Sequence, residues 1–261
     1  MSRRRVLGIA LRQWLTLRRS LPRLFDVFYW PVLEVTLWGL VTQYLLTQAG
    51  ATFAPSLLIG GMILWTLLHR ASEDLSIAFL EESWSQNLPN LFASPLQPVE
   101  YLAGAAIVGT IKVLGAGAVV AGLAYLFYGY GLWELGPTLL AAVPALVAFG
   151  WALGLITMGL TLRYGRQVDV LAWSFTIVFQ PLVCAVYPLE VLPPSMQLVA
   201  GLLPPTHVFE AARAAAAGAP AAAELLIGLL GGLLALALGA LYFWTGLAYA
   251  RVHGRLASAG E

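Results

Sequence analysis

His69 and Asp74 are separated by four residues, the H-x4-D spacing in which a membrane acyltransferase uses histidine as general base and aspartate to orient it. On a helix, however, residues five apart point about 140° away from each other. The chain also contains no companion phosphate-binding segment of the FPEG type. We therefore favour a cytosolic helix end in which Arg70 pairs with Glu73 or Asp74, three and four residues later, and keep the acyltransferase as an alternative.

Two ionisable residues lie deep within apolar runs, Glu34 and Lys112. Such residues are costly in lipid and are functional candidates for that reason. The rise per residue places Glu34 about 10 Å and Lys112 about 20 Å from the same membrane surface, so we do not expect a direct pair. Cys184 is the only cysteine, which excludes an intrachain disulfide and predicts a small packed side chain. No metal site is expected, because the three histidines are scattered: His69, His207 and His253.

The elements that must hold these residues are membrane helices. The chain of 261 residues is 60% hydrophobic and only 10% charged, whereas a soluble domain is about one quarter charged. Six low-charge runs reach the ~20 residues that a helix needs to cross a bilayer. They are 27–46, 53–72, 101–127, 136–162, 168–188 and 222–250. We predict an all-α polytopic membrane protein, and the net charge of +1 gives no reason to expect a nucleic-acid partner.

The positions of the arginines predict the orientation of the chain. Seven precede the first run, Arg251 and Arg255 follow the last, and Arg163 and Arg166 lie between runs four and five. The segments 47–52 and 128–135, on the opposite side, contain no Lys or Arg. Both termini should therefore be cytoplasmic.

Residues 1–26 form a separate predicted element. Arg5, Arg12 and Arg19 recur every seven residues along one side of a helix, with leucines and Trp14 on the other side. We expect an amphipathic helix lying in the membrane surface and ended by Pro22. The remainder, 27–261, should form the six-helix domain.

A short amphipathic segment, about 82–93, follows the second run. Trp84, Leu88, Leu91 and Phe92 fall at i, i+4, i+7 and i+8 and predict one apolar stripe on a short cytoplasmic helix. Ser94-Pro95 ends it. Such a helix is suited to dock a cytosolic partner.

The segment at about 190–213 is also unusual. Its apolar run, 196–203, is too short to cross the membrane and is bracketed by Pro193-Pro194 and Pro204-Pro205. We expect a helical hairpin that dips into the outer leaflet, with Glu210 and Arg213 paired across one turn.

Together these segments resemble the ABC-2 family of ATP-binding-cassette permease subunits. The resemblance rests on the arginine-rich first helix, on Glu81, Glu82 and the segment NLPNLFASPL, and on YPLEVLPPSMQLVAGLLPPTHVFEAAR from Tyr187 to Arg213. It implies that 82–92 is a coupling helix inserted into a groove of an ATPase. The implied coupling residues are Glu82, Trp84, Gln86, Leu88, Leu91 and Phe92, and the implied outer gate comprises Glu190, Pro194, Pro204, Glu210 and Arg213.

The resemblance implies an exporter subunit in the bacterial cytoplasmic membrane. The single lysine, in TIKVL, excludes a G-x-x-x-x-G-K-[ST] phosphate loop, so ATP and Mg²⁺ would bind a separate ATPase subunit. A homodimer is expected, with the path at its interface, opened by alternating access or as a channel. The candidate path residues are Tyr29, Trp30, Glu34, Trp38, Trp173, Phe175 and Phe179. This aromatic lining suits an amphipathic, lipid-linked, glycan or drug-like substrate; an ATP-independent carrier is the remaining alternative.

Overall fold

Four long apolar helices dominate the fold. The computed structural model describes residues 1–47 and 58–254, apart from the side chains of Phe92, Glu134 and Arg166. The four helices that are long and apolar enough to cross a membrane are α2 (Leu21–Thr47), α5 (Pro98–Tyr128), α6 (Thr138–Tyr164) and α10 (Ala222–Val252). They correspond to four of the six predicted runs, within two residues at each end that falls short. The described residues form helices and turns and include no strand.

The helix α3 (Leu58–Trp84) lies at the centre of the molecule and is longer than predicted. The expected span was 53–72, of which 53–57 lies outside the described residues. The helix continues for 12 residues beyond position 72, through a stretch that contains acidic side chains. That extension is tolerated because these acids have basic partners, on α3 itself or on other helices, as described below.

The expected fifth span, 168–188, is wrong as a single helix. The helix α7 (Leu171–Phe179) has nine residues and follows the short 3₁₀ turn η3 (Gly165–Val168). Pro181, which lacks a backbone N–H, lies just beyond its end. Cys184 then adopts a φ of 56°, in the left-handed region, before η4 (Leu189–Val191).

Close packing of α6 with α10 depends on small residues spaced seven apart. A Cβ built at Gly232, Gly239 or Gly246 of α10 would lie 2.7 to 2.8 Å from a backbone oxygen of α6. Those oxygens also follow a seven-residue spacing, at Ala145, Ala152 and Gly159. The two helices are therefore parallel, and their backbones approach as in small-residue membrane interfaces.

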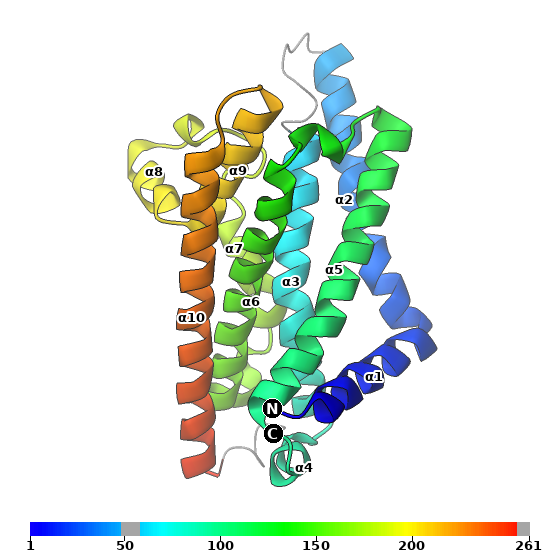
Figure 1. Ribbon diagram of the computed structural model, residues 1–261, viewed down its shortest axis with the longest axis vertical. Coiled ribbons are helices and arrows are strands. Elements are labelled where there is room, and N and C mark those ends of the chain that lie inside the picture. Colours follow the sequence, from blue (N-terminus) through cyan, green and yellow to red (C-terminus); the bar gives the residue numbers. More distant parts are fainter. Residues whose placement is uncertain (48–57, 255–261) are drawn as a thin grey trace.

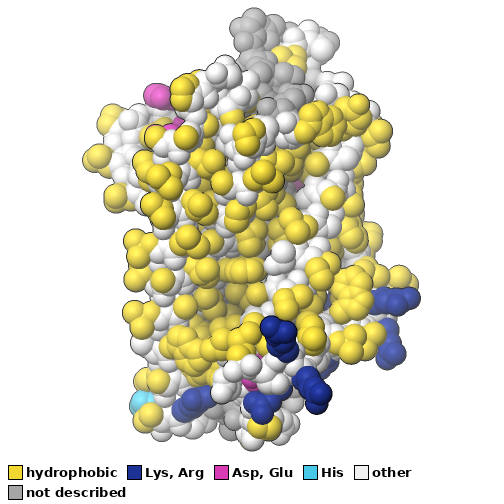
Figure 2. Space-filling view, in the orientation of Figure 1, with side chains coloured by type: hydrophobic (Ala, Val, Ile, Leu, Met, Phe, Trp, Pro, Cys, Tyr) yellow, Lys and Arg dark blue, Asp and Glu magenta, His cyan; other side chains and the backbone are white. Residues whose placement is uncertain are grey.

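The short helices gather at the two ends of the bundle (Figure 1). At one end lie α1 (Arg3–Arg19), which crosses the bundle obliquely, α4 (Leu88–Ala93) and the end of α10. At the other end lie η2 (Leu132–Leu135), α8 (Pro194–Gly201) and α9 (Pro204–Ala216). Lys and Arg side chains collect at the α1 end, while apolar side chains cover the middle of the face shown in Figure 2.

The expected first helix stops earlier than predicted. The helix α1 ends at Arg19 and Ser20 is extended, so that Pro22 lies in the first turn of α2 rather than closing α1. Proline is accepted there because the first-turn N–H groups have no partner within the helix.

Candidate functional site

The single helix expected at 82–93 is wrong. A bend at residues 85–87, which we call the elbow, separates α3 from α4. The helix α3 ends at Trp84, Gln86 adopts a φ of 53°, and α4 begins at Leu88. Pro89 lies in the first turn of α4, where a proline starts a helix readily but could not continue α3. The Asn87 N–H donates to the Glu82 carbonyl at 2.9 Å and closes the turn.

The apolar side of α4 is buried against the rest of the chain. Leu88 and Leu91 are 1% and 7% exposed, in a cluster with Ile9 of α1, Phe79 of α3 and Tyr101 of α5. Three polar side chains around the elbow remain exposed: Ser85, Gln86 and Asn90. The side chain of Phe92 lies outside the described part. The elbow is therefore held to three helices and presents a polar surface outward.

Glu82 does not belong to that outward surface, contrary to the expectation that it meets the ATPase. Its side chain is buried and forms an ion pair with Arg12 of α1. The Asn87 side-chain amide donates to its other oxygen at 2.6 Å. Both carboxylate oxygens thus have partners within the chain, so Glu82 serves to lock α1 to the elbow.

Two further ion pairs attach the first helices to the same region. Arg5 lies 3.4 Å from Glu100, whose two oxygens also accept from the backbone N–H groups of Ser2 and Gln97 at 2.6 and 3.0 Å. The Arg23 guanidinium lies 3.1 Å from the Glu81 carboxylate. Glu100 and Gln97 form the capping box that starts α5. The elbow, α1 and the starts of α2 and α5 therefore form one connected unit.

Trp84 departs from the predicted apolar stripe and contacts α7. Its ring stacks on that of Trp173 with 5.8 Å between centroids. Its indole Nε1–H donates to Asp169 Oδ2 at 2.6 Å. A predicted coupling residue thus touches a predicted path residue, and sequence patterns missed this contact because 89 positions separate the two residues.

The other candidate path residues do not converge on one place. Tyr29 and Trp30 are partly exposed on α2 and meet edge to face at 5.3 Å. Phe179 instead packs inward, edge to face with Phe175 at 5.5 Å and with Phe149 of α6 at 6.1 Å. Of the remaining two residues on α2, Trp38 packs against the main core, and Glu34 accepts a hydrogen bond from Thr66 at 3.2 Å.

A cluster of charged side chains lies between α2, α3 and α5. Arg70 is 3% exposed and lies 2.9 Å from Glu73 and 3.6 Å from Asp74, which confirms its predicted pairing. It also lies 3.4 Å from Asp26 of α2, and Lys112 of α5 donates to Asp74. The cluster is therefore in the interior of α3, not at a cytosolic helix end as expected, because α3 continues past it.

This cluster also bears on the acyltransferase alternative. Asp74 Oδ1 is engaged by Arg70 and Lys112. His69 instead stacks on Trp65, with 5.9 Å between ring centroids, and its Nε2 has no hydrogen-bond partner among the described residues. The structure therefore does not assemble the base and its orienting aspartate.

At the opposite end of the molecule, Glu210 and Arg213 form the predicted pair, with 2.6 Å between Arg213 Nη2 and Glu210 Oε1. Both members of the pair also form hydrogen bonds with residues outside α9. Arg213 donates to the Cys184 carbonyl at 2.7 Å, and the Leu189 N–H donates to Glu210 at 2.9 Å. Of the other gate candidates, Glu190 is exposed. Pro194 and Pro204 are the first residues of α8 and α9.

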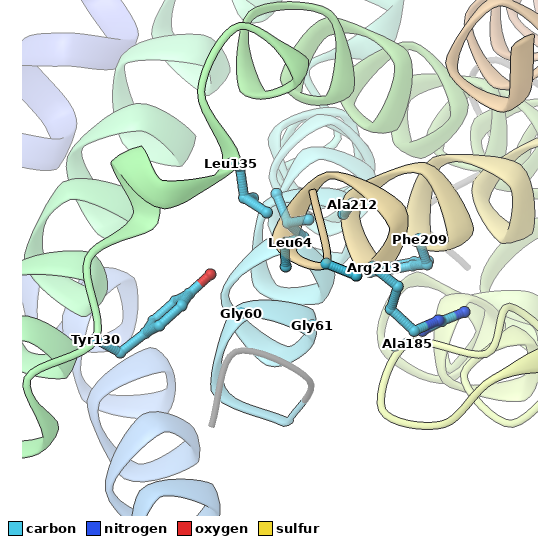
Figure 3. A pocket seen from close by; sticks show the side chains of 11 residues that line it. Gly60, Gly61, Leu64, Tyr130, Leu135, Ala185, Phe209, Ala212 and Arg213 are labelled. Carbon is cyan, nitrogen blue, oxygen red and sulfur yellow. The ribbon is translucent and has the colours of Figure 1, made fainter. Parts of the chain in front are cut away.

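A small cavity of about 140 Å³ lies beside this pair (Figure 3). Arg213 and Phe209 of α9, Tyr130 and two glycines of α3 contribute to its lining. A Cβ at Gly61 would lie 1.9 Å from the Ala185 carbonyl oxygen, so glycine is required where α3 passes the segment after α7. The cavity is mostly apolar.

Comparison with known proteins bears on the whole arrangement. A family model described as ABC-2 type transporter matches residues 9–216, from the first turns of α1 to the end of α9. No curated protein matches the chain.

Proposed function

The chain belongs to the ABC-2 type transporter family, and on this premise we propose that it is the permease subunit of an ATP-driven exporter in the bacterial cytoplasmic membrane. The family and the four apolar helices make it a multi-pass membrane protein. In this proposal α3 and the α7 region complete six crossings, and both termini are cytoplasmic. A separate ATPase subunit binds ATP and Mg²⁺.

The contact of Trp84 with Trp173 and Asp169 carries the proposal. Motion imposed on the elbow would reach α7 directly through a ring stack and a hydrogen bond. Because ion pairs join the elbow to α1 and α1 to α5, these elements would move together. This is the arrangement that a coupling device requires.

The docking surface would be the exposed side of the elbow. Ser85, Gln86 and Asn90 face outward there, and a groove of about 460 Å³ between α1 and α4 lies beside them. The polar residues that line the groove are Arg5, Asn87, Asn90 and Ser94, and the remaining lining residues are apolar or glycine. An ATPase would accordingly meet polar side chains of α4 and basic side chains of α1.

The translocation path is proposed to lie between two copies of the chain. The aromatic residues of α2, among them Tyr29 and Trp30, and Trp173 of α7 are partly exposed and without complete cover in one copy. Aromatic rings offer stacking surface and little that would solvate an ion. We propose an amphipathic, lipid-linked, glycan or drug-like substrate.

The assembly test uses the full chain with an affinity tag, expressed with and without a separate ATP-binding-cassette ATPase chosen from the same genome. The chain alone should show no ATP hydrolysis above background, and the co-expressed proteins should purify as a complex of two copies each that hydrolyses ATP. A phosphate-loop lysine variant of the ATPase is the matched control and should keep the complex but lose hydrolysis. Robust hydrolysis by the chain alone, or failure of the two proteins to associate, would contradict the proposal.

A further inference from the structure

A narrow apolar crevice of about 230 Å³ lies where the bend between α1 and α2 meets the middle of α5. Leu17 and Val27 form its floor and are 8% and 3% exposed. Its rim carries three large side chains that are only partly covered: Trp14, Phe28 and Ile111. The crevice is thus a built recess that continues into the lipid-facing surface.

Gly115 of α5 keeps this crevice open. A Cβ placed there would meet no atom within 4 Å, so close helix packing does not require a glycine at this position. A larger side chain would project into the recess. The volume suits part of one acyl chain, with the rest of the lipid remaining in the bilayer.

Two cations line the crevice, Arg18 of α1 and Lys112 of α5, and its described lining includes no acidic residue. Arg18 is exposed, and the structure shows no ion pair for it within residues 1–47 and 58–254. Lys112 has three N–H donors, of which one is directed to Asp74. Both groups can therefore donate to an anion at the mouth of the crevice.

A neighbouring cavity of about 530 Å³ shares Leu17 and Lys112 with the crevice but is lined by charges of both signs. Its carboxylates are Asp26, Asp74, Glu81 and Glu82, and its cations are Arg12, Arg23 and Lys112. Glu82 is paired with Arg12, and Glu81 with Arg23. An anionic headgroup would therefore be favoured on the side of Arg18, where no carboxylate lines the crevice.

We propose that this crevice binds one anionic phospholipid from the leaflet beside α1. Its phosphate lies against Arg18 and Lys112, and the first part of one acyl chain lies between Trp14, Phe28 and Ile111. The bound lipid fills the space at the α1–α2 bend and braces α1 against α5. This site is separate from the elbow surface assigned to the ATPase.

Lipid retention by the purified full-length protein tests the proposal. The protein is stripped of lipid in an uncharged detergent and then mixed with phosphatidylglycerol or phosphatidylcholine of identical acyl chains. Native mass spectrometry counts bound lipid, and a third arm adds inorganic phosphate as competitor. Phosphatidylglycerol should bind at least about tenfold more tightly than phosphatidylcholine, with two cations contributing, and inorganic phosphate should not displace it.

Matched variants locate the site. Gly115→Leu should weaken phosphatidylglycerol binding about tenfold, because the added side chain takes the place of the acyl chain. Gly122→Leu on the same helix, where a Cβ also meets nothing within 4 Å, should have no effect. Arg18→Gln should lower phosphatidylglycerol binding about fivefold and leave phosphatidylcholine binding unchanged, whereas Arg4→Gln, at the other end of α1, should change neither.

Several outcomes would overturn the proposal. Equal binding of the two lipids by the unaltered protein would exclude recognition of an anionic headgroup. Equal effects of Gly115→Leu and Gly122→Leu, or of Arg18→Gln and Arg4→Gln, would place bound lipid elsewhere. Displacement by inorganic phosphate would indicate an anion site that holds no acyl chain. Arg18→Gln alters an exposed residue, so it decides the matter even if Gly115→Leu does not fold.

Discussion

At the residue scale, the partners of each buried charge explain why the elbow, α1 and the starts of α2 and α5 hold together. The Glu82 carboxylate, 8% exposed, faces Arg12 on one oxygen and Asn87 on the other. A buried charge that loses one partner costs more than the pair contributes, because the remaining group stays desolvated. Glu82 is therefore a structural residue first, and any effect on coupling would act through the position of the elbow.

Replacement of Arg12 should show the cost of leaving a buried carboxylate without its cation. Arg12→Ala should lower the free energy of unfolding by about 1–2 kcal/mol, since half of the pair is solvent-exposed and only Glu82 is left buried. Glu82→Gln in the same background should recover part of the loss. The measurement is reversible unfolding in mixed detergent as a double-mutant cycle, with exposed Arg4→Ala as control. Independent, additive effects of the two substitutions would contradict the pairing.

Trp84 is the residue through which we expect the elbow to act on α7. Trp84→Ala removes both the ring stack on Trp173 and the hydrogen bond to Asp169. The complex should remain intact, but the permease should no longer change the rate at which the ATPase hydrolyses ATP. Trp84→Phe keeps a ring and should retain part of the response. Trp244→Ala on α10, where the tryptophan is also 37% exposed, is the control. ATP hydrolysis is compared at equal yields of complex; identical behaviour of Trp84→Ala and Trp244→Ala would remove Trp84 from the coupling route.

At the element scale, one side chain joins α9 to the segment that follows α7. Arg213 of α9 binds both Glu210 and the Cys184 carbonyl in that segment. Because Cys184 is the only cysteine and its side chain is fully buried, its thiol reports whether this segment opens.

Arg213→Ala should raise the rate at which Cys184 reacts with a thiol reagent by about tenfold, as expected when a charge-assisted bond is lost from a local opening equilibrium. Arg4→Ala, at the opposite end of the molecule, should leave the rate unchanged. The rate is followed by mass spectrometry under native conditions. An unchanged rate in Arg213→Ala would mean that the segment is held by its apolar contacts alone.

The seam between α6 and α10 leads to a second prediction at this scale. Gly239→Ala places a methyl group 2.7 Å from the Ala152 carbonyl oxygen and should cost about 1–3 kcal/mol of stability through forced separation of the helices. Gly122→Ala, in open space on α5, should be neutral or slightly stabilising because alanine is the better helix former. Thermal unfolding of the two purified variants makes the comparison, and equal midpoints would show that α6 and α10 do not depend on this approach.

Long helices could be predicted from the sequence, whereas the elbow and the end of α3 could not. Apolar length alone predicts α2, α5, α6 and α10, because lipid demands a run of about 20 apolar residues. The continuation of α3 to Trp84 depends on cations 70 and 38 positions away, Arg12 for Glu82 and Lys112 for Asp74. Such partners are set by tertiary packing, and no local pattern contains them.

The candidate site, likewise, could be predicted only in part from the sequence. The pairs Glu210–Arg213 and Arg70 with Glu73 and Asp74 follow from helical spacing and are present. The interruption at Gln86 to Asn87 and the short α7 depend on where a proline ends one helix and begins the next. The contact of Trp84 with Trp173 is a consequence of that interruption, which turns Trp84 away from the stripe formed by Leu88 and Leu91.

At the scale of the whole molecule, the basic end and the outer helices give the chain two chemically different faces. Arginines gather around α1 and the elbow, and the short proline-started helices α8 and α9 lie at the far end (Figures 1 and 2). If the basic end is cytoplasmic, as the distribution of cations indicates, an ATPase would meet the elbow and α1 and could not reach α8 or α9. Function, orientation and docking surface are thus linked in one claim.

Site-directed cross-linking to the co-expressed ATPase tests that claim most directly. Asn90→Cys on the exposed side of α4 and Ser195→Cys on exposed α8 are each made in a Cys184→Ala background and treated with a short bifunctional reagent. The account predicts a covalent product with the ATPase for Asn90→Cys and none for Ser195→Cys, in complexes of equal yield. A product from Ser195→Cys, or none from Asn90→Cys in an intact complex, would contradict it.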